Sequence, residues 1–191
     1  MYGMIHQGAR SLAVARLGQE EWDALAARNG LTEAHFIGLR HSSDAETLRL
    51  VGLIAERLGF GLAETLLEFG RSWFEFAATA GFGRTLRMAG GDIETFVGNL
   101  ERMHVAIGST MPRARLPSFE IVSRSAQEIR MVYRSERDGL APFLEGILVA
   151  AAERFGEDIH VTHDARPEDV LFVLTRRGAQ HSGRRQSRTR P

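Results

Sequence analysis

The chain has 191 residues, of which 43% are hydrophobic and 25% charged, as in one globular domain of ordinary size. Its formal net charge is zero, which gives no electrostatic argument for binding nucleic acid or anionic lipid. Cysteine is absent, which excludes disulfides, iron–sulfur clusters and cysteine-based zinc sites, and the lack of a long apolar run or a signal-peptide pattern favours a cytoplasmic protein outside the membrane.

The first 80 residues predict four helices. Apolar residues at helical spacing place them at residues 2–16, 19–28, 43–58 and 61–80. Gly18 and Gly59 are typical helix-ending residues, and Ser43 with Glu46 forms a capping-box pattern. The fourth helix is rich in aromatic residues, which is typical of a bulky core helix. The glycine-rich stretch 81–91 is expected to bracket a short helical turn.

The second half predicts two helices and four strands. The helices are expected at residues 92–108 and 139–155, and the strands at 119–122, 129–133, 159–163 and 170–174. Asp92 is a good N-cap for the first of these helices, and Gly108 is expected to end it. The four strands could form one antiparallel sheet, so we predict an α+β fold: a helical N-terminal subdomain, about residues 1–60, and a mixed part, about 61–175. Residues 176–191 are basic without apolar periodicity, which predicts a disordered tail.

His104 is the imidazole on the apolar face of the 92–108 helix, four residues after Leu100 and one turn before Ile107. An imidazole buried there needs a partner, because an unpaired buried polar group costs about 2 kcal/mol or more. From the residues alone, a core histidine bonded to a carbonyl or a water is the commoner explanation. A ligand role is the alternative.

Tyr133, Ser135 and Arg137 are spaced by two, so an extended backbone would direct all three side chains to one face. A phenol, a hydroxyl and a guanidinium side by side suit a pair of carboxylates or a phosphate. The outward polar face of an edge strand would show the same alternation. The pattern alone therefore leaves both interpretations open.

Short motifs along the whole chain resemble those of one family, the haem-nitric oxide/oxygen binding (H-NOX) family. They are Met1-Tyr2-Gly3, Phe69-Gly70-x-x-Trp73, Asn99-Leu100-x-x-Met103-His104-x-x-Ile107-Gly108, Pro117-Ser118-Phe119-Glu120 and Tyr133-Arg134-Ser135-Glu136-Arg137-x-Gly139-Leu140-Ala141-Pro142-Phe143. The resemblance extends from residue 1 to about residue 175. The histidine helix combined with the Tyr-x-Ser-x-Arg motif is specific, whereas either alone would not be.

The resemblance implies a haem-binding domain over residues 1–175, with haem b buried between its two parts and held noncovalently. His104 would be the proximal iron ligand. Tyr133, Ser135 and Arg137 would bind the two haem propionates. Other haem contacts would come from Ile5, Leu100, Met103 and Pro117, the proline pressing on the porphyrin.

The expected distal pocket is apolar. Members of the family that bind O2 stabilise it with a distal tyrosine, and the matching position here is Pro142. The two tyrosines, Tyr2 and Tyr133, belong to other motifs. The distal lining would be Ile5, Trp73, Phe74, Pro142, Phe143, Leu144 and Ile147, with the Trp73 indole N–H as a potential donor.

The resemblance therefore implies a non-catalytic NO sensor that also binds CO and binds little or no O2. NO would break the iron–His104 bond and shift the conformation. By family analogy the partner would be a bacterial histidine kinase or an enzyme of cyclic-di-GMP metabolism. An O2-binding or redox-active haem protein is the alternative, although a haem enzyme would need distal acid–base groups. A haem-free interaction module is a further one.

The remaining histidines do not predict a metal site or another functional site. His160 and His163 have metal-like spacing, but no cysteine is present to complete a known zinc site, so no zinc is expected. The others, His6, His35, His41 and His181, are expected at the surface.

Overall fold

The computed structural model describes residues 1–79, 90–111 and 113–177. Its helices are α1 (Gly3–Leu17), α2 (Gln19–Arg28), α3 (Asp44–Leu58), α4 (Leu62–Thr79), α6 (Ile93–Thr110) and α7 (Ala141–Phe155), with a 3-10 turn η1 (Glu33–Phe36). The strands are β1 (Ser118–Arg124), β2 (Glu128–Arg134), β3 (Ile159–Ala165) and β4 (Val170–Arg176). They form one antiparallel sheet in the order β1-β2-β4-β3. The predicted α+β fold is confirmed. The turn η1 had not been predicted.

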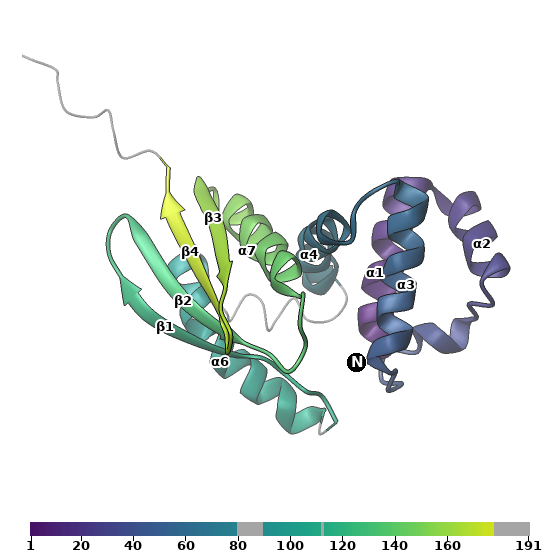
Figure 1. Cartoon of the computed structure of the whole chain (residues 1–191), viewed down its shortest axis with the longest axis horizontal. Coiled ribbons are helices and arrows are strands. Elements are labelled where there is room, and N and C mark those ends of the chain that lie inside the picture. Colours follow the sequence, from purple (N-terminus) through teal and green to yellow (C-terminus); the bar gives the residue numbers. More distant parts are fainter. Residues whose placement is uncertain (80–89, 112, 178–191) are drawn as a thin grey trace, which may run out of the picture.

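Three layers organise the molecule (Figure 1). Helices α1, α2 and α3 form one end, the sheet and α6 form the other, and α4 and α7 lie between them. Leu66 and Phe69 of α4 belong to the hydrophobic cluster of the first end, whereas Phe74 of the same helix belongs to the cluster beneath the sheet. Helix α4 therefore contributes to both hydrophobic clusters. The predicted subdomain boundary near residue 60 stays a prediction.

The local signals that begin and end the N-terminal helices are confirmed. Gly18 ends α1 with φ +88°, and Gly59 ends α3 with φ +72°, a backbone region that favours glycine. At the start of α3 the Ser43 hydroxyl accepts the Glu46 amide at 3.1 Å, and the Glu46 carboxylate accepts the Ser43 amide at 2.8 Å.

Several predicted boundaries were wrong, and three of them have a clear physical reason or consequence. Helix α6 does not end at Gly108 but continues to Thr110, because Met111 precedes a proline and that position disfavours a helical backbone. Helix α7 begins at Ala141 rather than at residue 139, because Gly139 has φ +76°. Strand β4 includes Arg176, which pairs with Ile159 and was placed in the tail. The rest of the tail, from residue 178, and residues 80–89 lie outside the described residues.

Helices α4 and α7 are in backbone contact at two glycines. A Cβ added at Gly70 would collide with the carbonyl oxygen of Phe143, and one added at Gly146 would collide with that of Leu67. These glycines therefore fix the spacing of the two central helices. In the described part of the chain, no helix is both long and apolar enough to span a bilayer.

Candidate functional site

A cavity of about 250 Å³ lies where α1, α4, α6, α7 and the first two strands meet. The predicted site residues that line it are Ile5, Trp73, Phe74, Leu100, Met103, His104, Pro117, Tyr133, Ser135, Arg137, Phe143, Leu144 and Ile147. Residues up to 146 positions apart in the sequence are thereby brought to one apolar space, since Met1 and Ile147 both line it. The structure thus gathers the predicted set, with one exception.

The exception is Pro142, which does not line the cavity. It stands in the first turn of α7, a position that proline tolerates. Phe143, Leu144 and Ile147 lie at spacings of three and four and share the face of α7 that meets the cavity, whereas Pro142 lies off that face. Pro142 therefore lies outside the cavity in this structure, and its expected contribution to the distal lining stays a prediction.

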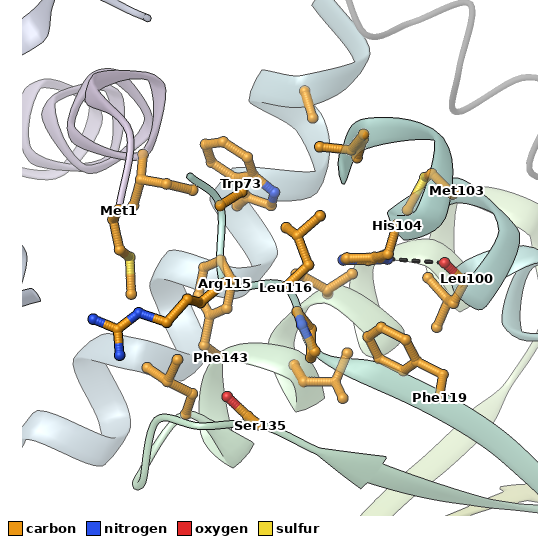
Figure 2. Close-up of a pocket in the computed structure, with 18 of the residues that line it drawn as sticks. Met1, Trp73, Leu100, Met103, His104, Arg115, Leu116, Phe119, Ser135 and Phe143 are labelled. Carbon is orange, nitrogen blue, oxygen red and sulfur yellow. Dashed lines mark hydrogen bonds between the residues drawn. The ribbon is translucent and has the colours of Figure 1, made fainter. Parts of the chain in front are cut away.

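The ring of His104 has a fixed orientation and tautomer. Its Nδ1–H donates to the carbonyl oxygen of Leu100 at 2.8 Å, the bond dashed in Figure 2, so the neutral ring keeps its Nε2 lone pair free. Burial lowers the pKa of His104, although the Leu100 carbonyl and the Glu101 carboxylate act in the opposite direction. The Phe119 ring packs against the imidazole with centroids 4.8 Å apart. The site therefore presents a neutral imidazole.

The polar end of the cavity is formed by Tyr133, Ser135 and Arg137, but not as an extended row. Strand β2 ends at Arg134, and the Ser135 hydroxyl accepts the Arg137 amide at 3.0 Å in the turn that follows. The one-face arrangement expected from the two-residue spacing required an extended backbone through Arg137, and the structure has a turn there, which this hydroxyl favours. All three side chains still reach the cavity. Burial raises the pKa of Tyr133, so its phenol remains a neutral donor.

Arg137 is held at the junction of three segments. Its guanidinium donates to the Arg115 carbonyl oxygen at 2.6 Å, and its Nε lies 3.0 Å from a carboxylate oxygen of Asp44. The same carboxylate lies 3.3 Å from the N-terminal ammonium of Met1. Although burial acts to raise the pKa of Asp44, these two cations lower it overall. Arg137 is thus oriented to meet anionic groups.

The two sides of the cavity differ in character. In Figure 2, His104, Leu100 and Phe119 lie on one side, and Trp73 and Phe143 lie on the other. The second side is completed by Phe74, Leu144 and Ile147. Among the side chains of α4 and α7 at the cavity, only Trp73 carries a hydrogen-bond donor, its indole N–H.

Several lining residues were missed by sequence reasoning. Tyr2 lines the cavity, its ring edge-on to His41, so both tyrosines of the chain reach it. Arg115 adds a second guanidinium and forms an ion pair with Glu136 at 3.4 Å. No periodic signal marks the segment that contains Arg115. The others are Met1, Met4, Ala77, Phe96, Ile107, Met111, Ala114, Leu116, Phe119 and Leu140.

One histidine assigned to the surface is instead buried. His6 is 1% exposed; its Nδ1 lies 3.0 Å from the carbonyl oxygen of His35 and its Nε2 lies 2.9 Å from the Thr47 hydroxyl. The surface expectation failed because these partners are distant in sequence. His160 and His163 have separate neighbours, Arg177 and Glu145. His181 lies outside the described residues.

An apolar cavity with a free imidazole nitrogen on one side and anion-binding donors at its end has the chemistry that a haem-binding domain requires. Comparison with known sequences agrees. Residues 2–163 match the Haem-NO-binding family model, and the chain belongs to this family, the H-NOX family of haem-based gas-sensing domains.

Named relatives are soluble guanylate cyclases. The chain is 28% identical over 190 residues to soluble guanylate cyclase gcy-35 of Caenorhabditis elegans, covering 92% of this chain and 27% of that protein. It is 28% identical over 125 residues to the soluble guanylate cyclase subunit beta-2 of Rattus norvegicus, covering 60% of this chain and 18% of that protein. The chain thus spans about a quarter or less of the length of these relatives.

Solved structures confirm the fold. An H-NOX protein from S. oneidensis in the Fe(II)NO state has a TM-score of 0.81 at 20% identity, covering 93% of this chain and all of that chain. An oxygen-binding H-NOX domain in its oxygen complex has a TM-score of 0.78 at 18% identity, covering 93% and 96%. Since proteins with NO and with O2 share this fold, the fold does not determine the gas.

Proposed function

We propose that this chain is an NO sensor in which His104 ligates the iron of haem b. The orientation of the imidazole carries the proposal. Its Nδ1–H is bonded to Leu100, which leaves Nε2 as the nitrogen that can bind a metal, and the bonded N–H raises the basicity of the ligand. Ferrous haem supplies an iron atom that binds diatomic gases.

The residues that line the cavity fit a haem group. The cavity is apolar along most of its lining, as a porphyrin requires, and its end offers a phenol, a hydroxyl and a guanidinium to two propionates. Tyr133 stays neutral and can donate, and Arg137 can share its charge between Asp44 and a propionate. The remaining haem contacts are assigned to Ile5, Leu100, Met103 and Pro117.

Gas selectivity follows from the wall opposite His104. Phe143, Leu144 and Ile147 offer no hydrogen bond to a polar Fe–O2 unit, whereas NO and CO need none. We therefore propose NO as the signal, CO as an additional ligand, and little or no stable O2 binding. Tyr2 and Trp73 are the potential donors that the test must address.

In the proposed response, His104 would hold the iron until NO binds, and its release would let the second half of α6 move with the loop that carries Pro117. This is a two-state element biased by a ligand. The chain would act without catalysis of its own, from the cytoplasm, on a separate bacterial histidine kinase or an enzyme of cyclic-di-GMP metabolism. The functional unit would comprise residues 1–175.

Absorption spectra of the ferrous protein test the proposal. We expect a Soret band in the purified protein, an unchanged ferrous spectrum in air, and a spectrum lacking the histidine ligand after NO is added. His104→Gly should need added imidazole to restore the ferrous spectrum, whereas the exposed-site control His160→Gly should not. A protein that lacks a Soret band would exclude the haem sensor. A stable O2 spectrum would exclude NO selectivity, and its loss in Tyr2→Phe or Trp73→Phe would identify the donor.

A further inference from the structure

Strand β1 is an edge strand, and a carboxylate of α6 satisfies one of its amides. The sheet order places β1 beside β2 alone, so amides on its outer side have no strand partner. The Phe119 N–H donates to Glu101 Oε2 at 2.7 Å. Glu101 is otherwise exposed, so this bond is its principal tie to the rest of the molecule.

This bond closes a loop that holds two groups of the site. Glu101 and Phe119 are 18 positions apart, and both His104 and Pro117 lie between them. Residues 101 and 104 are one turn apart on α6, so their side chains share a face of the helix. The Phe119 ring contacts the His104 imidazole at a centroid distance of 4.8 Å. Phe119 therefore meets the same turn of α6 twice, through its amide and through its ring.

The turn of α6 next to Glu101 is the last one that is firmly buried. Leu100 is 2% exposed, whereas Met103, His104 and Ile107, which continue the same face of the helix, are only partly buried. Without the Glu101–Phe119 bond, the orientation of the His104 turn would depend on partial burial, on the Leu100 carbonyl and on the contact with the Phe119 ring. The Glu101 carboxylate is thus placed where it can limit the movement of the His104 imidazole.

We propose that Glu101 is a positioning residue for His104: its carboxylate fixes the His104 turn against β1 and thereby sets the strength of the iron–His104 bond. The inference rests on the proposed role of His104 as the iron ligand. It also assigns to Glu101 the coupling between His104 and β1, since a displacement of the imidazole is transmitted through this bond to the strand that follows Pro117.

Resonance Raman spectroscopy of the ferrous haem protein tests the first part. Glu101→Ala should lower the iron–histidine stretching frequency and accelerate loss of the histidine ligand after NO is mixed in, by roughly tenfold for one charge-assisted bond. Glu101→Gln keeps a side-chain carbonyl acceptor at the same reach and should restore both values. Glu120→Ala is the matched control, because Glu120 lies on the same strand and pairs with Arg134 instead.

Hydrogen exchange of the Phe119 amide gives a readout that does not depend on iron. This amide should be protected in the wild-type haem protein and exchange roughly tenfold faster in Glu101→Ala. Glu101→Asp retains the charge but is one methylene shorter, so it should resemble Glu101→Ala. This variant serves as the test if the alanine variant does not fold.

Three results would overturn the inference: a stretching frequency unchanged in Glu101→Ala, failure of Glu101→Gln to restore it, or an equal shift in Glu120→Ala. Failure of the proposed function is distinguishable. In that case the wild-type protein would show no iron–histidine stretch, while exchange at Phe119 would still respond to Glu101→Ala.

Discussion

The two walls of the cavity are stabilised by different kinds of interaction. The wall with His104 consists of α6, β1 and β2, and it is held by single hydrogen bonds such as those of Leu100 and Glu101. The opposite wall comes from α4 and α7, whose backbones touch at Gly70 and Gly146. Close-packed backbones are rigid, whereas a partly exposed helix turn is not. In the proposed response, the His104 wall would therefore be the part that moves, and the α4–α7 wall would be the fixed reference.

Helix α6 shows the same difference between a firmly held part and a less firmly held part. Its first half is anchored: Asp92 caps the helix by accepting the Thr95 amide at 2.8 Å, and Glu157 accepts the Ile93 amide at 2.6 Å. Ile93 is fully buried. In the second half, the residues that continue the same face, Met103, His104 and Ile107, are only partly buried. Motion that follows release of His104 should therefore be confined to the second half, and the anchored half acts as the pivot.

The largest expected effect on stability comes from disrupting the backbone contact between α4 and α7. Gly70→Ala or Gly146→Ala forces a Cβ against a backbone carbonyl that cannot rotate away, so we expect a loss of about 3 kcal/mol in the free energy of unfolding, measured by urea denaturation. Gly52→Ala in α3 is the control: nothing lies within 4 Å of its added Cβ, and replacing a helical glycine should stabilise by about 0.5 kcal/mol. Equal effects at the two kinds of site would contradict the idea of a rigid wall.

A smaller effect is expected at the polar end, where the two walls meet. Arg137→Ala removes the guanidinium assigned to a propionate, so haem affinity should fall about tenfold, as measured by transfer of haem to a haem-scavenging protein. Arg134→Ala is the control, since that guanidinium pairs with Glu120 and Asp169 and does not line the cavity. An unchanged transfer rate in Arg137→Ala would remove this residue from the site.

The sequence predicted the parts of the site that local patterns or motifs mark. The helical periodicity around His104 and the Tyr133-x-Ser135-x-Arg137 spacing alone left a core histidine and a polar strand face as alternatives. The combination of the two motifs, through its resemblance to the H-NOX family, predicted which of these side chains share the cavity. What failed depended on distant partners. His6 is buried because Thr47 and the backbone of His35 fold over it, and Tyr2 and Arg115 reach the cavity from segments without periodicity. No local sequence pattern predicts contacts between segments that are so far apart in the chain.

The smallest effect concerns the helices that support the fixed wall. His6 follows Ile5 of the cavity, and burial lowers the pKa of its imidazole below the ordinary value of about 6.5; the carbonyl of His35 and the Glu46 carboxylate favour its protonation, and Arg40 and His35 oppose it. Below pH 6.5 the unfolded chain therefore binds a proton that the folded chain resists. It follows that stability falls as the pH falls from 6.5 towards the lowered pKa.

His6→Gln should flatten this part of the pH dependence, because glutamine keeps hydrogen-bonding capacity but does not titrate. The measurement is urea unfolding of the haem protein between pH 7 and pH 5. The exposed His41→Gln should keep the wild-type slope. If the slope is the same in His6→Gln, the acid sensitivity arises elsewhere. Since His6 bonds to Thr47 at the start of α3, a flatter slope would identify the contact between α1 and α3 as a source of the acid sensitivity.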